Sequence, residues 1–322
     1  MKAALERWLT RRWYGGVAPG LGLRALARVY GRILKARSPA VGQRLPVPVV
    51  VIGNFTAGGT GKTPLTIALA EYFFSRGFRP AIVSRGHGRR SDLPLRVSAD
   101  MPAELCGDEP KLMFEITGLP VLVDSDRVAA ARAAIDQGSN LIVADDGLQH
   151  LRLGRDVEIE VLDGERLYGN GRLLPAGPLR EAPRPCDFRV ITGGIVQGSD
   201  WPMRLQLTDC ISLDDADLLR PLAQFAASPV HAVCGIGNPA RFFKALREAG
   251  LRPIEHAFED HHQFVAADFA GLVGPILMTE KDAVKCRELG LSDAWAVPVE
   301  ARLPAEFFAA IEQKLKERHA RT

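Results

Sequence analysis

The chain has 322 residues, of which 47% are hydrophobic and 25% are charged, and its formal net charge at pH 7 is +3. This balance is typical of a folded globular protein, excludes a disordered or collagen-like chain, and with this length predicts about two domains. No run approaches the roughly 18 apolar residues of a spanning helix, and five scattered cysteines without a Cys-x-x-Cys pair exclude a disulfide framework. We therefore expect a protein of the reducing cytoplasm, either free or attached to a membrane surface.

The first 44 residues carry most of the positive charge. They hold ten Lys and Arg residues against one Glu, a net charge of +9, which leaves −6 for the rest of the chain. Apolar side chains recur there at helical spacing. The two stripes are Leu5, Trp8, Leu9 and Trp13, then Leu23, Leu26, Tyr30, Ile33 and Leu34. Such a segment either lies in an anionic membrane surface or packs on the protein's own core with a solvated basic face. Nucleic-acid binding is a third interpretation, which the acidic remainder of the chain disfavours.

A glycine-rich loop follows. Residues 49–53 are an apolar, β-branched run, and Gly61-Lys62-Thr63 opens a helical pattern. This order of strand, loop and helix is the context of a P-loop, in which backbone N–H groups surround phosphates, the Lys reaches the terminal phosphates and the Thr binds Mg²⁺. The usual pattern has Gly where this chain has Thr56. The predicted nucleotide-binding residues of this loop are Thr56, Ala57, Gly58, Gly59, Thr60, Gly61, Lys62 and Thr63.

Two loops beyond the P-loop helix carry further candidate residues. The strand at 81–83 leads into a basic loop, residues 84–90, which suits an anionic ligand or is simply a flexible turn. Asp108 and Glu109 come just before a helix, where acidic residues more often cap the helix than act in catalysis. Asp108 is a candidate general base if it faces the nucleotide, and Glu109 is a candidate metal ligand.

A second strong signal lies at residues 140–150, where an apolar strand ends in Asp145 and Asp146. A carboxylate at a strand tip downstream of a P-loop holds Mg²⁺ directly or through water, although a solvated turn is the simpler alternative. A proline-rich loop at 172–181 then carries arginines that would suit phosphates. The predicted metal ligands are Thr63, Asp145, Asp146 and Glu109.

The second half of the chain repeats the αβ pattern loosely. Residues 231–239 contain a strand and a glycine turn before a helix, but no Gly-Lys-[Ser/Thr], so we expect a second lobe rather than a second nucleotide site. His261 and His262 follow as an adjacent pair, which suits a metal less well than a polar loop.

Together these motifs resemble the tetraacyldisaccharide 4'-kinase family, the lipid A 4'-kinases of Gram-negative envelope synthesis. The pairing of Gly-Gly-Thr-Gly-Lys-Thr-Pro with Asp-Asp-Gly-x-Gln-His is the most specific part of the likeness, and the family's own pattern accounts for Thr56. The chain departs from the family at His87, where Tyr is expected, and at Ala182, where Pro is expected. The matching segments are 53–54, 58–64, 84–86, 107–110, 145–150, 174–181, 235–239, 260–262 and 279–282.

The resemblance implies ATP- and Mg²⁺-dependent phosphorylation of the 4'-hydroxyl of a tetraacylated glucosamine disaccharide 1-phosphate, at the cytoplasmic face of the bacterial inner membrane. By the same likeness Asp108 is the base that takes the sugar hydroxyl proton, and His261 is its partner from the second lobe, with His262 left open as an alternative. Lys62 would hold phosphates, and Arg180 and Glu181 would line the nucleotide or phosphate region.

The substrate implied by the resemblance also favours one interpretation of the basic start of the chain. Because its acyl chains stay in the bilayer, we expect residues 1–35 to contact the membrane surface as a peripheral attachment, with no nucleic-acid partner.

The predicted fold class is α/β, with a P-loop NTPase-like αβα core, a second, smaller αβ lobe and an N-terminal amphipathic helical segment. The predicted divisions are the membrane-associating segment 1–44, the core 45–193, a connector 194–225 and the C-terminal lobe 226–322. Two alternatives are weighed. A P-loop GTPase or metallochaperone-type switch would need an Asn/Thr-Lys-x-Asp motif to recognise guanine. Residues 279–282 contain Thr, Lys and Asp, but in a different spacing. A soluble small-metabolite kinase leaves the basic, Trp-bearing start unexplained.

Overall fold

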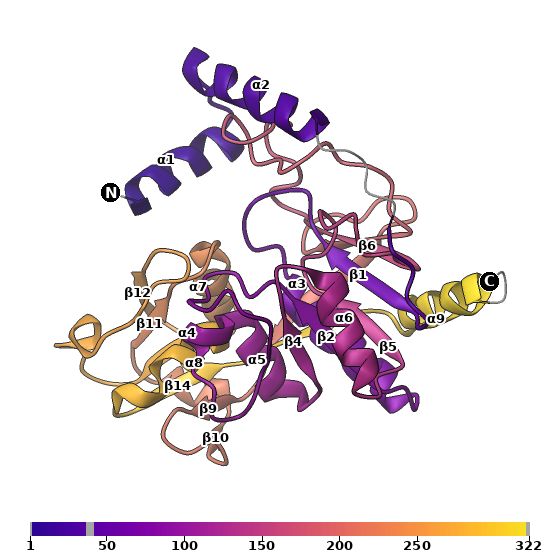
Figure 1. Ribbon diagram of the computed structural model, residues 1–322. Helices are drawn as coiled ribbons and strands as arrows, with labels where there is room; N and C mark the ends of the chain where they lie inside the picture. Colours follow the sequence, from indigo (N-terminus) through magenta and orange to yellow (C-terminus); the bar gives the residue numbers. More distant parts are fainter. Residues whose placement is uncertain (1, 37–41, 320–322) are drawn as a thin grey trace.

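The computed structural model describes residues 2–36 and 42–319, which form two sheets with helices packed on them and a separate pair of helices (Figure 1). The strands of the larger sheet are β1 (Val49–Gly53), β2 (Pro80–Ser84), β3 (Leu95–Arg96), β4 (Val121–Val123), β5 (Leu141–Ala144), β6 (Val157–Asp163), β7 (Phe188–Thr192), β8 (Trp201–Leu207) and β15 (Val299–Arg302). The helices of this lobe are α3 (Lys62–Ser75), α4 (Ala103–Cys106), α5 (Asp108–Thr117), α6 (Arg127–Asp136) and α9 (Ala305–His319).

The larger sheet places β1 at its centre, in the order β15-β8-β7-β6-β1-β5-β2-β4-β3. The seven strands from β8 to β4 pair in parallel, and the two edge strands β15 and β3 are antiparallel. All five residues of β1 are buried, because both faces of the sheet are covered. Val50 and Ile52 pack towards α3 and α9, whereas Val49 and Val51 pack towards α6. Burial on both faces explains why this strand is a continuous apolar run.

The smaller lobe is built on a six-stranded sheet in the order β10-β9-β14-β13-β11-β12. Four of its strands, from β14 to β12, are parallel. Its strands are β9 (Cys210–Ser212), β10 (Leu219–Arg220), β11 (Val230–Cys234), β12 (Pro253–Ala257), β13 (Ile276–Thr279) and β14 (Ala294–Val297). Helix α7 (Pro239–Glu248) packs on one face through Phe242, Phe243 and Leu246, and α8 (Glu280–Cys286) packs on the other. Three short 3₁₀ helices, Leu222–Phe225, Ala266–Phe269 and Arg287–Leu289, complete the lobe.

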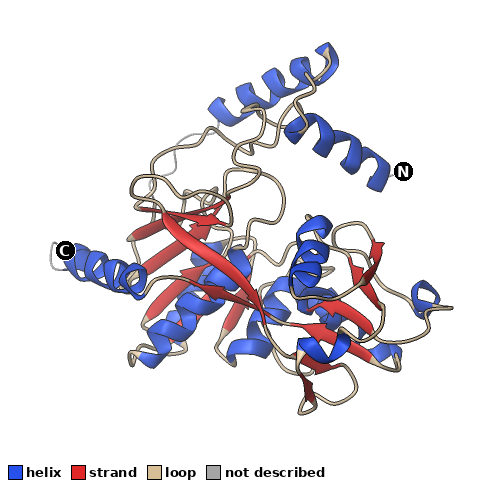
Figure 2. Ribbon diagram, turned by 180° about the vertical axis from the view of Figure 1, so that it is seen from behind, coloured by secondary structure: helices blue, strands red, loops and turns tan. Residues whose placement is uncertain are grey.

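The chain crosses between the lobes twice, and the two crossings lie side by side. It leaves the larger sheet on β8 and returns to it on β15, and these strands pair antiparallel with Val299 opposite Leu207. Just beyond this pair, the Thr208 amide donates to the Pro298 carbonyl at 3.2 Å. Figure 2 shows this link as a long ribbon that runs from one lobe to the other. A hydrogen-bonded pair of crossings ties the lobes more firmly than a single strand would.

The two N-terminal helices, α1 (Lys2–Tyr14) and α2 (Leu21–Ala36), lie outside both sheets (Figures 1 and 2). They rest on loops of the larger lobe: the Trp13 indole donates to the Pro175 carbonyl at 3.1 Å, and the Tyr30 hydroxyl donates to the Arg180 carbonyl at 2.8 Å. Leu26, Val29 and Ile33 remain exposed. Among the described residues, no helix is both long and apolar enough to cross a bilayer.

The two-sheet α/β architecture predicted from the sequence is confirmed, and its segments differ in detail. Residues 201–207, predicted to lie in a connector, are β8 of the larger sheet, and the connector's later residues supply β9 and β10 of the smaller one. Residues 299–319, assigned to the C-terminal lobe, return to the larger sheet as β15 and α9. Residues 1 and 37–41 of the predicted N-terminal segment, and residues 320–322 of the predicted C-terminal lobe, lie outside the described residues.

Candidate active site

The loop between β1 and α3 has the conformation that its glycines permit. Gly58 and Gly61 have φ of 108° and 95°, in the left-handed region that favours glycine, and Gly61 precedes the first turn of α3. A Cβ at Gly61 would lie 3.1 Å from the Met203 Cε atom. Thr56 pairs with Leu179 as an isolated antiparallel bridge and has no positive φ, so a side chain is accommodated where other P-loops carry Gly. The N-terminus of α3 thus opens onto a cradle suited to phosphate.

Lys62, the P-loop lysine, is held at this cradle by two partners. Its ammonium donates to the Asn54 Oδ1 atom at 3.2 Å and lies 3.6 Å from the Asp146 carboxylate. Arg180 meets the same Asp146 carboxylate through its Nη1 atom, at 3.0 and 2.8 Å from the two oxygens. Asp146 has a φ of 48°, unusual for a residue other than glycine, which aims its side chain at these cations. Lys62 and Arg180, predicted separately from the sequence, therefore converge on one carboxylate.

Asp145, next to Asp146, is almost fully buried. Its two oxygens accept from the Thr66 hydroxyl at 3.3 Å and the Ser84 hydroxyl at 3.4 Å. Burial first, and then the nearby Glu109 and Asp146 carboxylates, raise the pKa of Asp145, whereas Lys62 and Arg180 outweigh burial and lower the pKa of Asp146. Carboxylates crowded in this way favour a cation among them.

These residues fit the magnesium ion of a bound nucleotide. Among the described residues, no three His, Cys, Asp or Glu side chains gather closely enough to hold a metal on their own. Mg²⁺ commonly takes only one or two carboxylates and completes its shell with water and substrate phosphates. Asp145, Asp146 and Thr63, which line the same cleft, match that donor set. Glu109, also predicted as a metal ligand, lines the same cleft and is paired with Lys281 at 3.4 Å.

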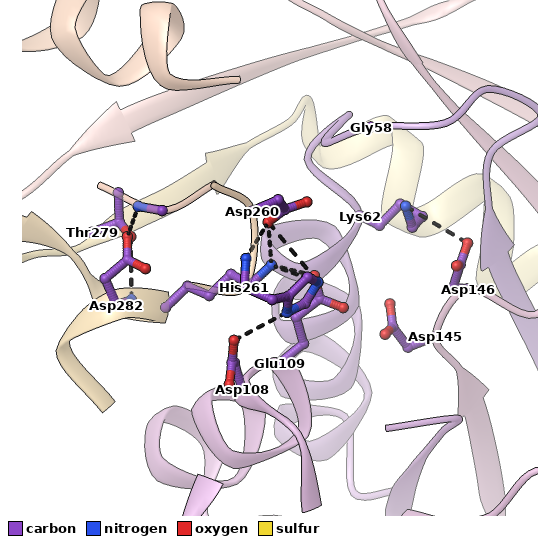
Figure 3. A network of polar contacts seen from close by, with 12 residues as sticks. Gly58, Lys62, Asp108, Glu109, Asp145, Asp146, Asp260, His261, Thr279 and Asp282 are labelled. Carbon is purple, nitrogen blue, oxygen red and sulfur yellow. Dashed lines mark hydrogen bonds and ion pairs between the residues drawn. The ribbon is translucent and has the colours of Figure 1, made fainter. Parts of the chain in front are cut away.

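Asp108, the predicted base, meets His261 across the boundary between the lobes. Asp108 begins α5 of the larger lobe, and the His261 Nδ1 atom lies 3.1 Å from its Oδ2 atom (Figure 3). The ammonium of Lys285, on α8, lies 3.7 Å from the same oxygen. Burial raises the pKa of Asp108, but the His261 hydrogen bond and the charges of Lys285 and Lys281 outweigh it and hold that pKa below its ordinary value. Asp108 is therefore a carboxylate at neutral pH.

His262 and His87 have different surroundings. The His262 Nε2 atom lies 3.0 Å from the Asp268 carboxylate, away from Asp108, so the structure brings His261 rather than His262 to the predicted base. His87 lies with its ring centre 5.1 Å from that of His261, and burial is the largest cause that lowers its pKa. The residue at which we expected Tyr from the resemblance thus packs beside the partner of Asp108.

One cleft of about 1280 Å³ lies between the lobes and is lined by Lys62, Glu109, Asp145, Asp146, Arg180, His87 and His261. Asp108 is not part of this lining and adjoins the cleft through its contact with His261. Figure 3 shows Lys62 with Asp145 and Asp146 on one side of the cleft, and Asp108, His261 and Asp260 on the other. The second lobe approaches the P-loop closely, since a Cβ at Gly237 would lie 3.2 Å from the Gly59 amide nitrogen.

The remaining predicted residues line the same cleft, together with others that the sequence did not single out. The cleft is lined by Gly58, Gly59, Thr60, Gly61, Thr63 and Glu181. Thr56 and Ala57 lie just behind them, joined by backbone contacts to Leu179 and Pro178. Arg127, the first residue of α6, also lines the cleft, and its buried Nε atom lacks a hydrogen-bond partner among the described residues. Lys281 was included only in the matching segment 279–282, and nothing in the neighbouring sequence predicts that it contacts His261.

A P-loop on a parallel sheet, a pair of carboxylates beside its lysine and a cleft between two lobes are the features of a phosphotransferase. A family model described as "Tetraacyldisaccharide-1-P 4'-kinase" matches residues 20–316. The chain belongs to the tetraacyldisaccharide 4'-kinase family.

Relatives and a solved structure agree with this assignment. The chain is 48% identical to the tetraacyldisaccharide 4'-kinase of Xanthomonas euvesicatoria pv. vesicatoria, over 94% of both chains. It is also 48% identical to that of Stenotrophomonas maltophilia, over 94% of this chain and 95% of the relative. Its structure matches LpxK from Aquifex aeolicus in complex with ATP with a TM-score of 0.72 at 27% identity, over 90% of this chain and 98% of that one. Family membership excludes the GTPase switch and the small-metabolite kinase considered above.

Proposed function

We propose that this protein transfers the γ-phosphate of ATP to the 4'-hydroxyl of a tetraacyldisaccharide 1-phosphate, at the cytoplasmic face of the bacterial inner membrane. The observation that carries the proposal is the position of the Asp108–His261 pair. His261 lines the same cleft as Lys62, Asp145 and Asp146, and Asp108 lies 3.1 Å from its Nδ1 atom, so an acceptor hydroxyl next to this pair has room to meet a terminal phosphate at Lys62.

The chemistry needs positioning and charge neutralisation more than covalent participation. Lys62 and the P-loop amides hold the phosphates, Thr63 with Asp145 and Asp146 would hold Mg²⁺, which neutralises developing charge on the phosphates, and Arg180 adds a further cation. The acceptor oxygen forms a bond to the γ-phosphorus while the bond to the β,γ-bridging oxygen breaks and ADP leaves. The hydroxyl proton passes to the Asp108 carboxylate, which His261 orients.

We further propose that the helices α1 and α2 dock the enzyme on the membrane that holds its substrate. The face of α2 that carries Leu23, Tyr30 and Leu34 is half-buried on the protein, while Leu26, Val29 and Ile33 on the adjoining face are exposed. Arg24, Arg28 and Arg32 flank this apolar surface. An exposed apolar face bordered by cations suits the interface of a bilayer with anionic lipids.

The domain division that we propose keeps residues 45–193 as the core of the P-loop lobe and residues 1–44 as the docking segment. Two corrections come from the topology. Residues 201–207 and 299–319 belong with the P-loop lobe, and the second lobe is the segment between them.

The proposal is tested by incubating the full chain with labelled ATP and a tetraacyldisaccharide 1-phosphate, and by looking for a bis-phosphorylated lipid. Asp108→Asn should lower kcat by about 10² or more, the contribution of a positioned general base, with ATP binding retained. Asp136→Asn, an exposed aspartate at the end of α6, is the matched control and should turn over normally. Wild-type turnover by Asp108→Asn would remove Asp108 as the base.

A further inference from the structure

Two lysines of α8, one turn apart, contact the Asp108–His261 pair from the second lobe. Lys285 lies beside Asp108, and its side chain is only 1% exposed. It forms an ion pair with Asp282 of the same helix at 2.8 Å and donates to the His262 carbonyl at 2.9 Å, which links the loop that carries the two histidines to α8. Lys281 makes a different kind of contact, directly with the imidazole.

Lys281 is surrounded by acceptors. Its ammonium nitrogen lies 3.2 Å from the Asp260 Oδ1 atom, 3.4 Å from the Glu109 Oε1 atom and 3.3 Å from the His261 Nε2 atom. An ammonium has three protons and no lone pair, so all three contacts have lysine as the donor. Burial would lower the pKa of Lys281, but the carboxylates of Glu109, Asp260 and Asp108 raise it above its usual value. Lys281 is charged, and it cannot accept a proton from His261.

The contact with Lys281 therefore determines which nitrogen of the His261 imidazole carries the proton. If the ammonium donates to Nε2, that nitrogen is the unprotonated one, and the single proton of the neutral ring is on Nδ1. The Nδ1–H group then donates to the Asp108 Oδ2 atom, 3.1 Å away. Other charged or titratable neighbours of the ring are Asp260, whose Oδ1 atom is 3.9 Å from Nε2, and His87.

We propose that Lys281 is a positioning residue that holds His261 neutral, with its proton on Nδ1, so that the imidazole serves as a hydrogen-bond donor to Asp108 and not as a second proton acceptor. This inference rests on the proposed catalytic roles of Asp108 and His261. The nearest contacts of both His261 and Lys285 to Asp108 are with Oδ2.

The protonation of His261 is measured directly by ¹⁵N NMR of the full chain labelled in histidine, near neutral pH. His261→Asn identifies its resonances among the seven histidines by their loss. The expected wild-type spectrum has one protonated nitrogen, Nδ1, and one unprotonated nitrogen, Nε2. A proton on Nε2 in the wild type would overturn the proposal.

Lys281→Met tests the contribution to catalysis. Without the ammonium, Asp108 and Asp260 are the charges nearest the ring, so Nε2 should gain a proton and the imidazolium should appear. We expect kcat to fall by about 10-fold, part of the roughly 10²–10⁴-fold supplied by a positioned base, with KM for ATP little changed. Lys316→Met removes an exposed lysine of α9 and should change neither quantity.

The outcomes separate this inference from the proposed function. Unchanged nitrogen shifts and kcat in Lys281→Met would refute the role of Lys281 while leaving Asp108 as the base. Full activity of His261→Asn would instead remove His261 from the proposed reaction, whatever its protonation in the wild type.

Discussion

Replacing Leu26, Val29 and Ile33 of α2 together by Ser should weaken binding to anionic vesicles by about 10²-fold. The three side chains are 57%, 52% and 54% exposed, so roughly half of each is available to lipid. Fully burying a side chain of this size is worth about 1.5–3 kcal/mol, so the exposed parts contribute about 1 kcal/mol each and about 3 kcal/mol together. That free energy corresponds to roughly 10²-fold in the partition constant.

The assay is co-sedimentation of the full chain with vesicles containing anionic phospholipid, over a range of lipid concentrations. Ile195→Ser with Val273→Ser is the matched control, because these side chains are 82% and 88% exposed but lie outside α1 and α2. The control should bind like the wild type. Undiminished binding by the triple variant, or an equal loss in the control, would refute the reasoning that this face of α2 enters the lipid. Leu5 and Trp8 of α1 stay in place and should leave residual binding.

Two further predictions concern the interior of the enzyme. Lys62→Ala should abolish phosphoryl transfer, because the ammonium between Asn54 and Asp146 is the P-loop cation; retained transfer would refute the P-loop assignment. The Glu280 carboxylate accepts a hydrogen bond from the Val299 amide, and burial, as the largest cause, raises its pKa from 4.5 to about 7. As the pH rises, the unfolded chain therefore loses the proton of this carboxyl group before the folded protein does. Its contribution therefore lowers stability as pH rises from about 4.5 to about 7, by at most about 3 kcal/mol. Glu280→Gln should remove that pH dependence from urea midpoints measured at about pH 5 and about pH 8, and an unchanged pH profile would contradict it.

The sequence predicts best what is encoded locally. The apolar run from Val49 to Ile52 predicts a buried strand, and the glycines up to Gly61 predict a tight loop before a helix. Both predictions succeed because the spacing of apolar residues and the need for glycine at a positive φ can be read from a few consecutive residues. The position of Asp145 and Asp146 near the P-loop is also predictable, because the carboxyl ends of parallel strands meet at one edge of the sheet.

Contacts between distant segments are what local patterns cannot supply. Asp108 and His261 are 153 positions apart, and only the family resemblance paired them. The edge strand β15 and its neighbour β8 are largely exposed, so their sequences give only a weak strand signal, and β8 was assigned to a connector. Lys281 lies in the first turn of α8, which the Thr279 hydroxyl caps. From the sequence alone it cannot be distinguished from any other charged residue at the start of a helix. Its role is visible only once the second lobe is folded against α5.

The division of the site between lobes has a chemical consequence. Asp108 belongs to the P-loop lobe, but His261, Lys281 and Lys285 all come from the other. Asp108, the proposed base, is therefore oriented by these side chains only where the lobes are in contact. We infer that a separated arrangement leaves Asp108 as an ordinary carboxylate at a helix start, poorly placed to activate water against bound ATP. We further infer that a substrate that fills the cleft and keeps the lobes together holds the whole set of second-lobe side chains against Asp108, which couples the competence of the proposed base to the presence of substrate.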